Sequence, residues 1–237
     1  MHNNWLEVVA VRHAEATHNV AASKCVETGE DPETVYVSWE FEDAELTESG
    51  REQARGLQNH PLVTRRRFDQ VWLSPLTRAI DTARSIFSEA NQEGRPFVHA
   101  GSVFGHEILR ERTKFHPANK RKTTAELKRL HPSIHWSHLK TWGTTPDTQW
   151  ETDEGDLSER CAELRRFFLE ETDPHVGTIM VVSHETLWKR FFQTTVDHPS
   201  DKHRFRFEGD WNEFGNADAK RFIVSRSTQG FPCWKPF

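Results

Sequence analysis

The sequence predicts an α/β fold, a three-layer α/β/α sandwich around a mostly parallel central sheet with one antiparallel edge strand. Residues 6–11 and residues 178–183 form short apolar runs rich in β-branched side chains. Such runs are typical of parallel strands, because helices cover both faces of the sheet. Residues 77–90 carry apolar side chains at helical spacing between these runs. This alternation of strand and helix patterns indicates a layered α/β architecture.

The remaining elements are expected in the following order. Residues 20–45 are polar and contain glycine and proline, so we expect a long functional loop there. Thr47 predicts the start of a helix that continues until Pro61. The second strand is expected at residues 68–73, before the helix at residues 77–90.

The last third of the chain contributes two more helices and two more strands, and one of these helices follows His184 with Leu187, Phe191 and Phe192. Residues 156–171 have an amphipathic pattern that predicts a helix, and the apolar strand at residues 178–183 follows it. Residues 221–225 are expected to form a strand at the edge of the sheet.

We expect residues 1–237 to fold as a single domain with a cap-like insertion at about residues 101–155, covering the C-terminal edge of the sheet. This segment has a low apolar content and no clean linker on either side. It contains Trp136, Trp142 and Trp150, which could line a pocket or pack a small subdomain.

Composition excludes several classes of protein. The net charge of −5 argues against a general nucleic-acid binder. No apolar run approaches the roughly 18 residues of a membrane span, and no secretory signal is visible, so we expect no membrane partner. Three scattered cysteines favour a reducing compartment, and a cytoplasmic location is expected. The sequence leaves open whether the protein is a monomer or a dimer.

Polar residues follow the apolar strands at positions where α/β sheets bind ligands. Arg12 and His13 end the first strand, and His184 follows the strand at residues 178–183. Arg78 falls in the first turn of a predicted helix, where an anion would offset the unfavourable placement of a cation. We interpret His13 as a nucleophile for phosphoryl groups and Arg12 as part of a phosphate clamp. The alternative is a strand that simply ends in polar residues.

Four separated motifs resemble the histidine phosphatase superfamily, also called phosphoglycerate mutase-like. They are Arg12-His13-Ala14-Glu15 with Asn19, Leu46-Thr47-x-x-Gly50-x-x-Gln53-Ala54, Ser74-Pro75-Leu76-x-Arg78-Ala79-x-x-Thr82-Ala83, and Val181-Val182-Ser183-His184. The match covers most of the chain, in the family's order. Leu109-Arg110-Glu111, with Pro117 after it, is similar to the fungal and plant phosphatase-like branch.

The resemblance implies a role for each of these positions. His13 would carry a phosphohistidine, and Arg12, Arg78 and His184 would hold the phosphoryl oxygens. Asn19 would contact phosphate or substrate, and Glu111 would be the proton donor, with Glu107 as the alternative. No metal and no other cofactor is implied. The expected activity is that of a histidine acid phosphatase or phosphoglycerate mutase-like hydrolase acting on a small phosphomonoester.

Two departures from the family pattern matter for the activity. The mutase pattern is absent at residues 37–41, which favours a phosphatase over a mutase. Glu185 follows His184 where the family usually has glycine or serine. A carboxylate beside a phosphate pocket is unfavourable unless it points away. Glu185 therefore motivates an alternative, in which the same fold performs non-phosphatase chemistry on a small metabolite.

Overall fold

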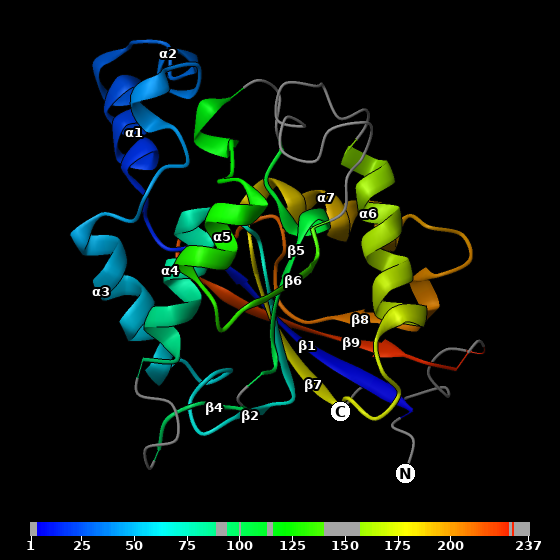
Figure 1. Cartoon of the computed structure of the whole chain (residues 1–237). Coiled ribbons are helices and arrows are strands. Elements are labelled where there is room, and N and C mark those ends of the chain that lie inside the picture. The colour runs from blue at the N-terminus through cyan, green and yellow to red at the C-terminus, as the bar shows by residue number, and fades with distance from the viewer. Residues whose placement is uncertain are drawn as a thin grey trace.

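The computed structural model describes residues 4–88, 94–99, 101–112, 116–139, 157–227 and 229. It confirms the predicted fold class. The central sheet has the strand order β6-β5-β3-β7-β1-β9-β8 (Figure 1). Its strands are β1 (Trp5–Arg12), β3 (Gln70–Leu73), β5 (Val103–His106), β6 (His135–His138), β7 (Thr178–Ser183), β8 (Phe205–Phe207) and β9 (Ala219–Ser225). A separate pair is formed by β2 (Arg67–Phe68) and β4 (Phe97–Val98).

The sheet is mostly parallel. Strands β1, β7, β3, β5 and β6 pair in parallel, while β9 is antiparallel to both β1 and β8. The prediction that the last strand lies at the edge was wrong, because β8 lies outside it. Strand β8 has only three residues, Phe-Arg-Phe, which is too short for a periodic pattern to reveal.

Helices cover both faces of the sheet, with α3 and α4 on one side and α6 on the other (Figure 1). The α-helices are α1 (Thr17–Thr28), α2 (Glu33–Tyr36), α3 (Glu48–Gly56), α4 (Thr77–Ile86), α5 (Thr124–Leu130), α6 (Leu157–Arg166) and α7 (Glu185–Val196). The short helical turns are η1 (Trp39–Phe41), η2 (Leu57–Asn59), η3 (Glu107–Leu109), η4 (Pro117–Asn119), η6 (Phe167–Glu171) and η7 (Lys202–Arg204). No helix within the described ranges has the length and apolar character needed to cross a membrane.

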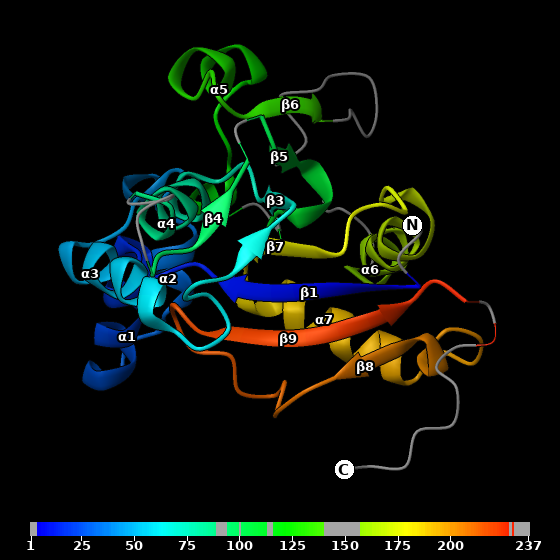
Figure 2. The same ribbon diagram turned by 90° about the horizontal axis from the view of Figure 1, so that it is seen from below.

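The alternation of side chains along β1 divides the core into two layers. Val8 and Ala10 pack with α6 and α7 in a cluster rich in phenylalanine and tryptophan. Val9 and Val11 point to the opposite face and pack with α4 and α5. Figure 2 shows β1 in the middle of the sheet between these helices. Because both faces of β1 are buried, its carboxyl end is held firmly in place.

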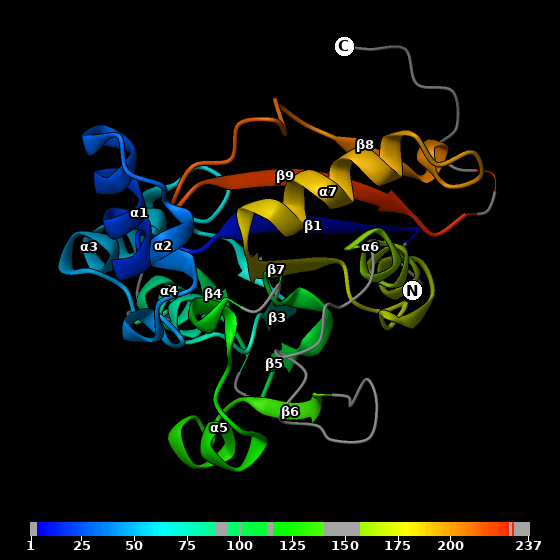
Figure 3. The ribbon, with the colours of Figure 1, turned by 90° about the horizontal axis from the view of Figure 1, so that it is seen from above.

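The segment at residues 20–45, predicted to be an irregular loop, is largely helical. It forms most of α1, then α2 and η1, and α1 and α2 lie beyond the C-terminal end of β1 (Figure 3). Helix α1 buries only His18 and Ala22, so it lacks the apolar stripe by which a helix is recognised. The expectation that this segment serves the functional site is taken up below.

Part of the predicted insertion extends the sheet. Within residues 101–139, β5 pairs with β3 and β6 pairs with β5, while α5 packs beside them. Strand β6 reads His-Trp-Ser-His, a polar sequence without a strand signature. Trp136 is buried in the core, and Trp142 and Trp150 lie outside the described residues. The division into one domain with a cap remains a proposal.

Helix α3 begins as predicted and contacts the loop after β1. Thr47 Oγ1 accepts a hydrogen bond from the Gly50 amide at 2.9 Å, the capping contact expected for this residue. A Cβ atom at Gly50 would lie 2.0 Å from the carbonyl oxygen of Glu15. Glycine is therefore required at position 50 by the close approach of another backbone.

Candidate active site

The register of the sheet brings the two strand-end histidines together. Arg12 on β1 lies opposite Ser183 on β7, and the His13 amide donates to the Ser183 carbonyl at 2.9 Å. The rings of His13 and His184 consequently lie 5.0 Å apart, measured between centroids. The juxtaposition predicted from two separate motifs is thus present.

His13 has a defined tautomer. Its Nδ1 lies 2.7 Å from the Ala14 carbonyl oxygen, which can only accept, so Nδ1 carries the proton. Its Nε2 faces Arg78 and accepts a hydrogen bond from Arg78 Nε at 3.3 Å. Burial, followed by the nearby Arg78 charge, lowers the pKa of His13 well below its ordinary value of 6.5. The imidazole is therefore neutral near pH 7, with a lone pair on Nε2.

His184 is held differently. Its Nε2 lies 2.8 Å from Ser74 Oγ, at the end of β3. Burial is the main cause that lowers the pKa of His184 well below 6.5, and the Arg78 charge adds to it. Its Nδ1 is buried and has no hydrogen-bond partner among the described residues. A buried polar atom without a partner costs free energy, which a bound anion would recover if Nδ1 carries a proton.

Arg78 opens α4 and is fully buried. Its Nη1 donates to the Ala118 carbonyl and its Nη2 donates to Asn119 Oδ1, each at 2.7 Å. Burial lowers the pKa of Arg78 to about 10, so the side chain remains charged at neutral pH. The turn η4 thus fixes the guanidinium that contacts His13. Sequence reasoning missed Asn119, because no motif marks this short turn.

The structure shows where the Glu185 carboxylate points. Glu185 Oε2 pairs with Arg12 Nη1 at 2.7 Å, and its Oε1 pairs with Lys189 Nζ at 2.5 Å. Arg12 Nη1 also donates to the Phe214 carbonyl at 2.7 Å. Within the described residues, Arg12 Nε and Nη2 have no hydrogen-bond partner, and Nε is buried. Glu185 therefore holds one end of the guanidinium and leaves the Nε–Nη2 edge unpaired.

A cavity of about 320 Å³ opens beside these groups, and it is lined by residues of polar or charged type. The lining residues are Arg12, His13, His18, Asn19, Glu33, Tyr36, Arg78, Glu111, Arg112, His116, Asn119, Glu185 and Thr186. Neither a tryptophan nor an aliphatic side chain is among them. Trp39 instead lies on the surface, with Lys120 Nζ 4.9 Å from its ring centroid.

The geometry separates the two candidate proton donors. Glu107 is buried and forms ion pairs with Arg110 Nε and Arg121 Nε, each at 2.9 Å, and it does not line the cavity. Glu111 is half-buried and does line it. The Glu111 charge opposes the effect of burial by raising the pKa of both Arg12 and Arg78. Of these two acids, Glu111 is the one beside the histidine pair.

Asn19 caps a helix and lines the cavity. Its Oδ1 accepts a hydrogen bond from the Ala16 amide at 3.0 Å, which caps α1, and the residue also lines the cavity. Its Nδ2 lies 3.2 Å from Nε2 of His18. His18 is buried, and its ring lies 6.2 Å from that of His13. Sequence reasoning missed His18, although its position next to Asn19 in the first motif was a signal.

The mouth of the cavity contains three further residues that sequence reasoning missed. Tyr36, the only tyrosine in the chain, stacks on His116 with ring centroids 5.4 Å apart. His116 Nε2 lies 3.1 Å from Glu33 Oε1. Helix α2 and the residue before η4 therefore meet across the entrance. The expectation that residues 20–45 contribute to the functional site is met by Glu33 and Tyr36.

The loop that carries His13 is anchored by two helices. The Ala14 amide donates to Thr82 Oγ1 on α4, and the Glu15 amide donates to Gln53 Oε1 on α3, each at 3.0 Å. Glu15 Oε1 also accepts from Thr47 Oγ1 at 2.5 Å. In the described part of the chain, no group of three or more His, Cys, Asp or Glu residues is arranged to hold a metal ion.

Comparison with known proteins identifies the family. Residues 8–210 match the model of the histidine phosphatase superfamily (branch 1). Because this match covers most of the chain, the chain belongs to the histidine phosphatase superfamily, as its motifs predicted. Two Arabidopsis thaliana relatives, a phosphoglycerate mutase-like protein and phosphoglycerate mutase-like protein 1, are 30% identical over 152 residues and 26% identical over 183 residues. These alignments cover 55% and 68% of this chain but only 54% and 61% of the relatives.

Solved structures support the fold. The ecdysone phosphate phosphatase of Bombyx mori, crystallised with tungstate, aligns over 98% of this chain and 96% of its own, with a TM-score of 0.57 and 13% identity. A phosphoglycerate mutase from Bacillus anthracis aligns over 94% of this chain and 89% of its own, with a TM-score of 0.53 and 16% identity. At these identities the likeness concerns the fold alone.

Proposed function

We propose that this protein is a metal-independent phosphatase that hydrolyses a small, polar phosphomonoester through a phosphohistidine on His13. The observation that carries the proposal is the state of the His13 ring. Its Nδ1 proton is held by the Ala14 carbonyl, burial keeps the ring neutral, and Nε2 faces Arg78. A neutral imidazole with a fixed lone pair beside a buried cation is suited to attack phosphorus.

In the first step, Nε2 of His13 would form a bond to phosphorus while the bond from phosphorus to the ester oxygen breaks. Glu111, protonated at this stage, would give its proton to the departing oxygen. Charge on the three remaining phosphoryl oxygens would be stabilised by Arg78, His184 and the unpaired Nε–Nη2 edge of Arg12. Asn19 would add a polar contact from the end of α1.

In the second step, Glu111 would take a proton from a water molecule as the water oxygen attacks phosphorus. The bond between phosphorus and Nε2 would then break, leaving inorganic phosphate and the free enzyme, with Glu111 protonated again. The two steps together consume one water molecule and one phosphomonoester. The arrangement uses the same carboxyl group first as an acid and then as a base.

The cavity supports a small and polar substrate. A volume of about 320 Å³ lies near the lower end for small-molecule sites, and its charged lining suits a hydrophilic body. The number of tryptophans in the sequence could suit a substrate with a large apolar group. No tryptophan or aliphatic side chain lines this cavity to contact such a group. The net charge of −5 and the free thiols of Cys25 and Cys161 fit a cytoplasmic metabolic enzyme that does not act on nucleic acid, as a monomer or a dimer.

The test is to trap the intermediate. Incubation with a panel of radiolabelled phosphomonoesters, followed by rapid denaturation, should yield a phosphoprotein that is labile to acid and stable to base. The His13→Gln variant should give no label and no turnover, while His175→Gln, which alters an exposed histidine outside the cavity, should match the wild type. Normal turnover by folded His13→Gln protein would refute the proposal.

The second candidate is non-phosphatase chemistry in the same cleft, and the presence of Glu185 in the cavity lining is the observation that motivates it. Binding of vanadate, an analogue of the phosphoryl transition state, distinguishes the two. If the protein is a phosphatase, vanadate should bind tightly to the wild type. The Arg78→Ala variant should no longer bind it. A wild-type protein that binds neither vanadate nor phosphate, and that hydrolyses no phosphoester, would favour the second candidate.

A further inference from the structure

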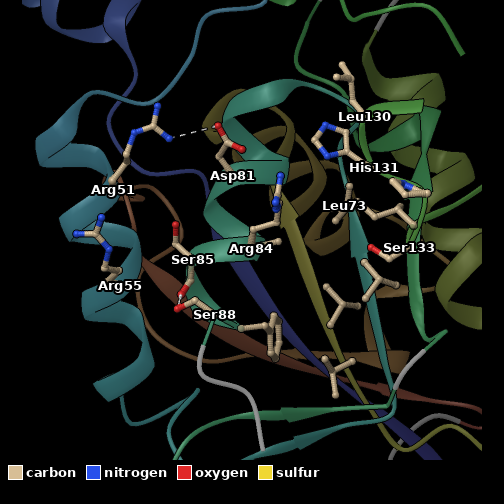
Figure 4. Close-up of a pocket in the computed structure, with 17 residues that line it drawn as sticks. Arg51, Arg55, Leu73, Asp81, Arg84, Ser85, Ser88, Leu130, His131 and Ser133 are labelled. Atoms are coloured by element: carbon tan, nitrogen blue, oxygen red, sulfur yellow. Dashed lines mark hydrogen bonds and ion pairs between the residues drawn. The ribbon is translucent and has the colours of Figure 1, made fainter. Parts of the chain in front are cut away.

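A second cavity, of about 720 Å³, lies across α4 and shares no lining residue with the cleft around His13 (Figure 4). Figure 4 shows Asp81 and Arg84 on α4 between the arginines of α3 and the turn that follows α5. Its volume falls in the range of sites that hold drug-sized molecules. The proposed phosphatase activity makes no use of this cavity.

One part of the cavity wall is apolar. Phe87, Val98 and Val103 are half-buried, and Leu130 is 40% exposed. They come from the residue after α4, from β4, from β5 and from α5, so four places in the chain contribute apolar surface to one hollow. Single exposed apolar side chains are ordinary on protein surfaces. A group of them lining one concave surface is a feature of ligand sites.

The other part of the wall carries three guanidinium groups without hydrogen-bond partners in the described chain. Arg51 and Arg55 on α3 make only long ion pairs, of 3.6 to 4.0 Å. Arg84 has neither an ion pair nor a hydrogen bond to any described residue. Each guanidinium group has five N–H donors in a planar fork that suits carboxylate or phosphate oxygens.

The described lining of this cavity contains more arginines than carboxylates. Asp81 is the only carboxylate among the described lining residues, and it lies 3.6 Å from Arg51. Burial raises the pKa of Asp81, which shows that this carboxylate is partly withdrawn from water. Glu45 and Glu48, outside the lining, share the long ion pairs of Arg51 and Arg55. Arg84 is therefore the lining arginine without an ion pair to any described residue, and a ligand that carries negative charge would pair with it.

We propose that this cavity is a second ligand site, and that it binds a small organic anion with an apolar or aromatic body. The body would cover Phe87 and its aliphatic neighbours, and the anionic group would lie among Arg51, Arg55 and Arg84. A cation is disfavoured by the arginines, and a neutral hydrocarbon would leave their donors without partners. Size, apolar surface and charge therefore point to the same class of ligand.

The probe for this site is 1-anilinonaphthalene-8-sulfonate, an aromatic anion whose fluorescence rises on transfer to an apolar site. We expect saturable binding with one dye per chain. N-phenyl-1-naphthylamine, the same aromatic body without the sulfonate, should bind at least ten-fold more weakly. Absence of saturable binding by the sulfonate, or equal affinity for the two dyes, would overturn the proposal.

Variants locate the bound dye. Arg84→Glu reverses an exposed, unpaired charge, and Ser133→Trp places a large side chain at an exposed lining position. Each should weaken dye binding at least ten-fold, with circular dichroism and the thermal midpoint checking the fold. Arg129→Glu, an exposed arginine of α5 outside the cavity lining, is the matched control and should bind as the wild type does. Equal affinity in all four proteins would refute the assignment.

Competition separates this site from the cleft. Protein saturated with vanadate, and the His13→Gln variant, should bind the dye with unchanged affinity and stoichiometry, because the two cavities share no residue. Displacement of the dye by vanadate would place it in the cleft and reject the second site. A failure of the phosphatase proposal would leave this dye experiment unaffected.

Discussion

His13 and His184 occupy equivalent places in the sheet but differ in which nitrogen is engaged. Each follows the last residue of a buried parallel strand, and burial lowers the pKa of both. The Ala14 carbonyl engages Nδ1 of His13 and leaves Nε2 toward Arg78, whereas Ser74 engages Nε2 of His184. Two identical side chains in similar burial thus present opposite nitrogens. The difference teaches that the local hydrogen-bond partner, and not the residue type or its depth, decides which nitrogen each histidine presents.

The sharpest test of this difference replaces each histidine in turn. His13→Gln should abolish the phosphoenzyme and lower kcat by more than about 10⁴-fold, because the attacking atom is removed. His184→Gln should keep a trappable phosphoenzyme on His13 and lower kcat by about 10²- to 10³-fold, since one donor to the phosphoryl oxygens is lost. Rapid-quench labelling measures both. Label on His184 in the His13→Gln protein would reverse the assigned roles.

The loop that carries His13 is anchored by α3 and α4, and Gly50 tests the contact with α3. Gly50→Ala would place a methyl group 2.0 Å from the Glu15 carbonyl, next to the loop that carries His13. We expect a loss of about 1–3 kcal/mol in the free energy of unfolding, together with a lower kcat. Urea denaturation and steady-state assays measure these effects.

The matched control for that experiment is Gly56→Ala at the end of α3. A Cβ atom at Gly56 meets nothing within 4 Å, and its φ of −58° suits alanine. This change should leave activity intact and stability equal or slightly higher. If Gly50→Ala behaved in the same way, the backbone contact with Glu15 would not be what holds the loop.

The shared burial of the histidines predicts a common pH dependence. His13, His18 and His184 have folded-state pKa values well below 6.5, so the unfolded chain binds more protons as the pH falls through 6.5. The free energy of unfolding should be constant above about pH 7.5 and should fall below pH 6.5. The loss is at most about 1.4 kcal/mol for each histidine at pH 5.5. Urea melts from pH 5 to 8 measure it.

Replacement variants sharpen this prediction. His13→Gln and His184→Gln should each remove one of the three contributions, and should therefore flatten the pH dependence to a similar extent. Unequal effects would mean that the engaged nitrogen, and not burial, controls protonation in the folded state.

The smallest expected effect concerns Ser74. Ser74→Ala removes the hydroxyl group beside Nε2 of His184 and leaves the His13 contacts unchanged. We expect stability to fall by about 1 kcal/mol and kcat by about ten-fold, with no change in the amount of phosphoenzyme that can be trapped. A loss of trapping as large as that of His13→Gln would show that the two histidines act as one unit.

Much of the fold and part of the site could be predicted from sequence, because they depend on local patterns. The strands that carry His13 and His184 are continuous apolar runs, and the helix that carries Arg78 has clear periodicity. Strands β6 and β8 and helix α1 lack such patterns, because they are polar or very short. Tertiary contacts, which the sequence does not display, hold these segments in place. Tyr36 and Asn119 carry no such signal, because they reach the site only through folding. The orientation of the Glu185 carboxylate could not be predicted from the sequence, because it depends on ion pairs with Arg12 and Lys189.

The stacked pair of Tyr36 and His116 has a consequence for how enzymes of this design can diversify. The groups proposed to attack and to hold phosphorus lie at the ends of β1 and β7 and at the start of α4, while the entrance is built by α2 and the chain before η4. Substitutions there can reshape which molecules are admitted without disturbing the chemical step. Substitutions at the entrance of the cavity can therefore change the substrate preference during evolution, while the proposed chemical step stays the same.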